Sequence, residues 1–305
     1  MSAGSGISHN SEKAGALAPL LKFIVVGTIT GLGFGLIMAV VSNGFVLGVK
    51  TLSSLREGQL SELLRFGDLP VSFAPVVSLL VAVAAILVVR RVFSINRWHG
   101  PADAIYAAHR SDNELDVKSG FGSTLAAFIS ASGGASVGQY GPLVHFGATM
   151  GSFLRQITGG VLSTDIFIGC GVAGAIAAGF NAPIAGIVFA HEAVLRHFSM
   201  RAIAPIAIAS VSSVWFSDAF FGSAHIFDLS SVSINLGHML PPALVAGPVF
   251  GLLAVLFMLA IRYSASFAAR SGWSPVRLLL TAAIGTGVIG MFIPEVLGLG
   301  TSALA

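Results

Sequence analysis

The chain has 305 residues, of which 55% are hydrophobic and 10% are charged, with a formal net charge of +3. Soluble domains carry about 25% charged residues, so this composition excludes an ordinary globular enzyme and a disordered chain. The small net charge also excludes the basic surface that nucleic acid binding needs. A polytopic membrane protein is left, with room for about ten spans of about 20 residues each.

The N-terminal part of the chain is predicted to contribute two spanning helices. Residues 1–19 are small and polar and are interpreted as a cytoplasmic tail. The apolar run over 23–49 is too long for a signal-peptide core and is interpreted as the first span. The second span is predicted over 73–89, just before Arg90 and Arg91.

The apolar runs in the middle of the chain are shorter and are separated by Gly and Pro. They cover 119–137, 142–157, 166–180 and 183–198. A helix of about 15 residues is about 22 Å long, which is less than the bilayer core of about 30 Å. Broken helices at membrane depth often mark the transport site of a transporter. Longer runs follow over 202–221, 241–261 and 276–293.

Lysine and arginine in the loops predict the orientation, because cytoplasmic loops are enriched in both. The stretch over 90–118 holds five of them, whereas the loop over 217–238 holds none. The first two spans are therefore expected to form a hairpin that starts and ends in the cytoplasm. The protein is expected to be an integral, multi-pass protein of a plasma or inner membrane, with its N-terminus in the cytoplasm.

Two segments resemble enzyme motifs, but neither has the context or spacing that the enzyme chemistry requires. Residues 134–138 match the G-x-S-x-G elbow of hydrolases, but they follow an apolar helix rather than a strand. His191 and His197 are six residues apart and so do not share a helix face, as the zinc motif H-E-x-x-H requires. Cys170 is the single cysteine, which excludes an intrachain disulfide. We expect no enzymatic activity, no metal and no cofactor.

Small residues at intervals of four predict close helix packing. Gly27, Gly31 and Gly35 fall on one face of the first span, and Gly147 with Gly151 repeats the spacing further along. Such ridges let helix backbones approach one another in a membrane.

The segment Gly138-Gln139-Tyr140-Gly141-Pro142 is the strongest candidate for a binding site. Pro142 suits the first position of a helix, where its missing N–H group would have no partner. The start of a helix exposes unpaired N–H groups and the positive end of the dipole, so it can bind an anion without a charged side chain. The alternative is a Gly/Pro break that serves packing alone.

Two further segments read as helix starts. Asn181 is predicted to cap a helix with Pro183 in its first turn. His99-Gly100-Pro101 is predicted to open another helix on the cytoplasmic side. Three such starts among short apolar segments suggest that several helix N-termini point inward.

These segments together resemble the CLC family of chloride channels and chloride/proton exchangers. Residues 169–189 read GCGVAGAIAAGFNAPIAGIVF, which is very similar to the G-x-x-A-G-x-x-A-x-F-N-A-P-L-A-G-x-x-F signature of that family. Residues 138–142 stand where the family has G-[KR]-E-G-P. The likeness extends from about residue 20 to the end of the chain.

The resemblance implies an all-α fold of two inverted halves with broken, re-entrant helices. It implies a first half over 20–221 and the start of a second, incomplete half over 222–305. It further implies a homodimer in the bilayer in which each subunit carries chloride, held by helix starts and hydroxyl groups, with a glutamate as gate and proton carrier. Chloride, or another small anion, would be the transported ligand.

The sequence departs from the family pattern at the gate. Tyr140 stands in place of the gating glutamate, and its hydroxyl stays protonated at neutral pH. Gln139 replaces the basic residue of the motif, and residues 97–101 lack the chloride-binding serine of the family's G-S-G-I-P loop. Backbone N–H groups after Pro101, or a protonated His99, are the candidate substitutes.

The second proton carrier is absent as well. Glu192 matches the general helix glutamate of the family, but Ala193 stands at the position that carries the second glutamate in exchangers. Glu192 is either a functional acid or a structural partner of Arg196 at i+4. His145, one turn into the helix after Pro142, is either a packing histidine or a group that tunes anion access with pH.

Three functions follow from these departures. Passive, uncoupled chloride movement is the first, because both proton-carrying glutamates are replaced. The second is a non-conducting fragment, scaffold or regulatory subunit, because the chain stops about where the family's second half is beginning. The third is a chloride/proton antiporter that uses other proton groups, such as His145 or His99.

Overall fold

A computed structural model describes residues 6–64, 72–109, 115–158, 161–222 and 236–300. It divides into a first unit of residues 1–224 with 283–305 and a second unit of residues 225–282. No β-strand occurs within the described ranges, which confirms the predicted all-α class. Within the residues that the structure describes, five helices are long and apolar enough to cross a membrane.

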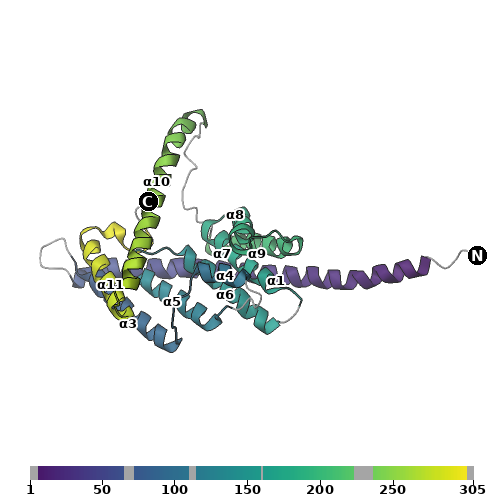
Figure 1. Ribbon diagram of the computed structural model, residues 1–305, viewed down its shortest axis with the longest axis horizontal. Helices are drawn as coiled ribbons and strands as arrows, with labels where there is room; N and C mark the ends of the chain where they lie inside the picture. Colours follow the sequence, from purple (N-terminus) through teal and green to yellow (C-terminus); the bar gives the residue numbers. More distant parts are fainter. Residues whose placement is uncertain (1–5, 65–71, 110–114, 159–160, 223–235, 301–305) are drawn as a thin grey trace, which may run out of the picture. The chain divides into compact units, whose positions relative to one another are not determined.

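The first unit contains most of the helices (Figure 1). They are α1 (Gly6–Leu55), α2 (Ser61–Leu63), α3 (Ala74–Val92), α4 (Pro101–His109), α5 (Val117–Gly133), α6 (Tyr140–Thr158), α7 (Thr164–Phe180), α8 (Pro183–Phe189) and α9 (Met200–Phe221). Two π-helical segments, η1 (Arg56–Leu60) and η2 (Ala190–Leu195), extend α1 and α8, and the 3₁₀ turn η3 (Pro294–Val296) follows near the C-terminal end.

The second unit contains α10 (Leu236–Arg270) and the first turns of α11 (Pro275–Phe292). Both helices qualify as membrane spans by length and hydropathy. The predicted runs over 241–261 and 276–293 therefore correspond to helices.

The first helix begins earlier than the apolar run suggests. It already starts at Gly6, inside the range interpreted as a polar tail, and it includes Pro19. The window that qualifies as a span begins at Ala18. The change from polar to apolar residues therefore predicted the start of the membrane span within α1, but it did not predict the start of the helix itself.

Helix α7 forms the centre of the first unit. Each residue from Ile166 to Ala177 is buried, and α1, α6 and α9 all pack against the helix (Figure 1). Small side chains make this possible, since Gly, Ala and the buried Cys170 let neighbouring backbones approach. A helix that is apolar all round is expected to be buried in this way.

The predicted small-residue ridges pack as expected. A Cβ atom added at Gly31 would lie 2.7 Å from the backbone oxygen of Pro205 in α9. Gly147 of α6 lies against the backbone of Gly171 in α7, and a Cβ atom added at Gly151 would lie 2.6 Å from the backbone oxygen of Phe167. Neither α1 against α9 nor α6 against α7 has room for a side chain at these points.

Two of the three proline-marked helix starts are as predicted, and one is displaced. Pro101 and Pro183 are the first residues of α4 and α8. Helix α6 begins at Tyr140, so Pro142 is its third residue rather than its first. The difference is small in energy, because the N–H groups of the whole first turn have no partner within the helix.

The prediction that Asn181 caps α8 was wrong. The residue before α8 is Ala182, and no side chain caps the helix. Asn181 instead ends α7, in the left-handed conformation with φ 52° and ψ 41°. Asn tolerates this conformation better than most residues, which makes it a common substitute for Gly at the end of a helix.

The interface between α1 and α9 can be tested with two glycines of α1. Gly31→Ala places a methyl group against Pro205 and is expected to lower the free energy of unfolding by about 1–3 kcal/mol. Gly33→Ala is the matched control, because nothing lies within 4 Å of its added Cβ atom, and it is expected to be neutral or stabilising. Thermal unfolding in detergent compares the two, and equal losses would contradict the close contact.

Asp116 caps α5. Its carboxylate accepts hydrogen bonds from the Ser119 backbone N–H at 3.1 Å and from the Ser119 hydroxyl at 2.5 Å. These hydrogen bonds lower the pKa of the carboxyl group against the opposing effect of burial. Because the pKa is lower in the folded chain, the stabilisation is complete above the ordinary pKa of about 4 and is lost as the pH falls through the folded value.

Replacing this cap should have a pH-dependent effect. Asp116→Ala is expected to cost about 1 kcal/mol of folding free energy at pH 7, and the cost should shrink as the pH falls below about 4. Asp116→Asn keeps a good cap and should retain most of the stability. Unfolding midpoints measured across pH check both, and a cost of the Ala variant that is independent of pH would refute the role of the ionised carboxylate.

Candidate functional site

The starts of α4 and α6 lie against each other. A Cβ atom added at Gly141 would be 3.5 Å from the Cγ atom of Pro101. Since Pro101 opens α4 and Gly141 is the second residue of α6, the positive ends of two helix dipoles come together here. The structure thus joins the segments 138–142 and 99–101, which sequence analysis selected separately.

The end of α7 closes the other side of this junction. The ring of Tyr140 stacks on the ring of Phe180, with the centroids 3.8 Å apart and the planes at 23°. Gly179 lies directly against the Tyr140 ring, where an added Cβ atom would come within 2.8 Å of it. Tyr140, which replaces the family's glutamate, is therefore held by the segment that carries the family signature.

Two histidines meet beside the helix starts. The rings of His99 and His145 are edge to face, with the centroids 6.0 Å apart. The His145 side chain is 1% exposed, and neither of its ring nitrogens has a hydrogen-bond partner among the described residues. The Nδ1 atom of His99 is likewise unpaired, whereas its backbone N–H donates to the Ser123 hydroxyl at 2.9 Å.

Gln139 adds a further unpaired group. The residue is buried, and its Oε1 atom has no partner within the described part of the chain. Buried polar atoms are almost always hydrogen-bonded, so several unpaired ones in one place indicate a site that a ligand or water completes. Gly138, by contrast, is exposed, and a Cβ atom added there would meet nothing within 4 Å.

The start of α4 already holds a carboxylate of the chain itself. Asp103 accepts a hydrogen bond from the Gly100 N–H at 2.8 Å and another from the Arg97 guanidinium at 2.5 Å. Sequence analysis assigned Asp103 no role, although an acidic residue two positions after a helix-opening proline is the usual signal for such a cap. The Gly100 N–H is therefore already hydrogen-bonded, whereas the N–H groups at the start of α6 remain available to a ligand.

The structural pairing predicted for Glu192 was wrong. Glu192 is exposed, and no ion pair with Arg196 occurs in the described structure. The i+4 rule fails because Glu192 lies in the π-helical segment η2, which ends at Leu195, and Arg196 turns into the left-handed conformation with φ 55°. Ala193 follows it at a half-buried position.

The two histidines after α8 make contacts within the same stretch of chain. The Nδ1 atom of His191 lies 3.1 Å from the backbone oxygen of His197, and its ring stacks on Phe198. No group of three potential ligands among His, Cys, Asp and Glu occurs within the residues that the structure describes.

The comparison with known families agrees with this architecture. The family described as "Voltage gated chloride channel" matches residues 80–305. The chain belongs to this family. As a member of the CLC family, it is a multi-pass integral membrane protein.

Relatives of this CLC chain share the family at low identity. A "Putative chloride channel protein ClcB-like" from Ralstonia nicotianae is 26% identical over 211 residues, which are 67% of this chain and 49% of that protein. The chain thus spans about half the length of this curated relative.

Solved structures share the fold. A slow cyanobacterial Cl⁻/H⁺ antiporter matches with a TM-score of 0.74 at 19% identity, over 91% of this chain and 66% of that one. A CLC-type fluoride/proton antiporter matches with a TM-score of 0.70 at 20% identity, over 92% of this chain and 69% of that one. At these identities the likeness establishes the CLC fold, including its broken helices.

Proposed function

We propose that this chain moves chloride passively across a membrane, without coupling to protons. The observation that carries the proposal is Tyr140 at the start of α6, where the CLC pattern has its gating glutamate. The Tyr140 side chain is a phenol that stacks on Phe180 and brings no carboxylate to compete with chloride for the start of the helix. Ala193, at the second glutamate position, supports the same function.

The chemistry of the site suits an anion. The start of α6 presents unpaired N–H groups and the positive end of its dipole, and α4 adds a second dipole. In the dry interior of a membrane protein such dipoles act more strongly than they would in water. The ligand is chloride or another small anion, since the relatives and structural neighbours include a chloride channel-like protein, a Cl⁻/H⁺ antiporter and a fluoride/proton antiporter.

The proposal extends to assembly and orientation. The protein acts as a homodimer in a plasma or inner membrane, and its N-terminus faces the cytoplasm. The arginine-rich loops support this orientation, since positive residues collect on the cytoplasmic side.

A flux assay in liposomes tests the proposal. Purified protein is reconstituted with a chloride gradient, and chloride efflux is recorded together with the external pH. We expect chloride efflux at any imposed pH gradient, with no linked proton uptake. Proton movement in fixed proportion to chloride would sink the passive mechanism, and the complete absence of flux would favour a non-conducting scaffold or regulatory subunit.

The position of Tyr140 in the pathway can be probed with two substitutions. Tyr140→Glu places a carboxylate at the start of α6, where it competes with chloride for the N–H groups, so efflux at pH 7 should fall about tenfold or more. Tyr140→Phe keeps the stacking on Phe180 and should conduct at close to the wild-type rate. Equal rates for all three proteins would place Tyr140 outside the pathway.

A specific observation favours a second candidate, a chloride/proton antiporter that uses histidine. His145 is buried with two unpaired ring nitrogens beside His99, and an imidazole ring can take up and release a proton. Burial lowers the pKa of His145 to about 4, so the ring is protonated mainly at acidic pH. The charged and titratable groups that act on His145 are His99 and Asp103, while Asp116 at the start of α5 acts on His99.

Substituting His145 distinguishes the two mechanisms. If His145 carries protons, His145→Gln should abolish proton movement while leaving some chloride efflux. If transport is passive, His145→Gln should change chloride efflux by less than about tenfold, at one ratio across pH 5–8, since it removes a single buried ring. Parallel recordings of chloride and pH from both proteins check this.

A further inference from the structure

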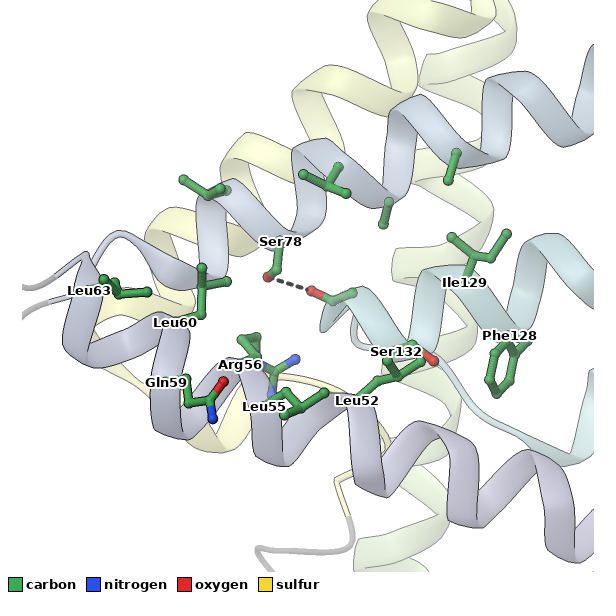
Figure 2. A pocket seen from close by; sticks show the side chains of 15 residues that line it. Leu52, Leu55, Arg56, Gln59, Leu60, Leu63, Ser78, Phe128, Ile129 and Ser132 are labelled. Atoms are coloured by element: carbon green, nitrogen blue, oxygen red, sulfur yellow. Dashed lines mark hydrogen bonds between the residues drawn. The ribbon is translucent and has the colours of Figure 1, made fainter.

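A separate pocket of about 490 Å³ lies between the C-terminal end of α1, η1, α3 and α5 (Figure 2). Its walls are almost wholly apolar, with Leu52, Leu55 and Leu60 on one side and Val81 and Phe128 on others. The volume falls in the range of pockets that hold small organic ligands. None of the residues at the starts of α4 and α6 lines it.

One charged side chain is buried in the wall of this pocket. Arg56 is 4% exposed, and its Nη2 atom donates to Glu57 at 2.7 Å. Its Nη1 atom occupies the space that a Cβ atom at Gly134 would need, and it has no hydrogen-bond partner among the described residues. A guanidinium group is always charged, so this nitrogen is a buried, unsatisfied donor.

A second unpaired polar atom lies at the same end of the pocket. The hydroxyl of Ser132 is buried without a partner, two residues before the Gly134 backbone that Arg56 contacts. Ser78 across the pocket is already satisfied, because its hydroxyl donates to the Gly133 carbonyl at 2.8 Å (Figure 2). The pocket therefore joins apolar walls to one cationic and one neutral donor.

This combination fits the chemistry of an acidic amphiphile. Apolar walls take a hydrocarbon chain, while Arg56 and Ser132 together can donate to the oxygens of an acidic head group. The pocket lies between two membrane spans, α1 and α3, where the surrounding lipid is the most abundant source of such molecules.

We propose that this pocket binds an anionic phospholipid of the bilayer. One acyl chain occupies the space among the leucines, and the phosphate accepts hydrogen bonds from Arg56 and Ser132. The exposed Glu57 holds the Nη2 end of the guanidinium, which leaves the Nη1 atom without a partner among the described residues. The proposal does not depend on whether the protein conducts chloride.

The test measures lipid binding by the purified full chain after removal of bound lipid. Phosphatidylglycerol is titrated against the protein in detergent, with phosphatidylcholine of the same chain lengths as the neutral comparison, and binding is followed by native mass spectrometry. We expect the neutral lipid to bind at least tenfold more weakly, because it adds an ammonium group near Arg56.

Two substitutions and a control localise the site. Arg56→Gln should weaken the binding of phosphatidylglycerol by roughly ten- to a hundredfold, and Ser132→Ala by a few-fold. Arg91→Gln, at an exposed arginine on the last turn of α3, should change it by less than twofold. Thermal unfolding checks that each variant is folded, and Ser132→Ala keeps the test decisive if Arg56→Gln does not fold.

Three results would overturn the proposal. Unchanged phosphatidylglycerol binding in Arg56→Gln and Ser132→Ala places the lipid elsewhere. Equal binding of the neutral lipid means that the pocket accepts any acyl chain. Binding of oleate but not of phosphatidylglycerol makes the occupant a fatty acid rather than a phospholipid.

Discussion

The contact between the backbones of Gly147 and Gly171 fixes α6 directly on the buried helix α7, and the candidate site depends on this contact. Because the two backbones touch, α6 cannot slide or rotate on α7 without a clash, so its first residue is held at a fixed height. That height sets Tyr140 against Phe180 and Gly141 against Pro101. This glycine pair thus helps to set where the starts of α4 and α6 meet.

Tight helix packing also leaves buried polar groups without hydrogen-bond partners in two separate places. At the helix starts these are Gln139, His99 and His145, and at the pocket between α1, η1, α3 and α5 they are Arg56 and Ser132. Backbones that approach through glycine and alanine leave little freedom for side chains to find partners. Burying a polar group without a hydrogen bond costs folding free energy unless a ligand or water supplies the missing partner. Both places are therefore candidate binding sites.

The sequence predicted the helices well, and the reasons are local. Proline at a helix start and glycine at spacings of four leave strong patterns, so Pro101, Pro183 and the ridge of α1 were placed correctly. The family signature identified the fold, which the match over residues 80–305 confirms.

What the sequence missed depends on backbone conformation and on distant contacts. Asn181 was assigned to the wrong helix, because a left-handed end of α7 and a cap of α8 require similar residues. Glu192 was given a helical partner that the π-helical segment η2 removes. Arg56 follows the first apolar run in the sequence, and its burial becomes visible only in the packing of α5 near α1 and η1.

The carboxylate of Asp103 gives the junction an asymmetry with a consequence for residence time. Since Gly100 donates to Asp103, an anion that arrives between α4 and α6 finds one helix start neutralised and one free. Under the proposed function, such an anion would meet few donors and would lie beside the Asp103 carboxylate, which is paired with Arg97, so its stay would be short. Conduction requires that an ion enter readily and also leave readily. Asp103 would then favour fast release over tight binding.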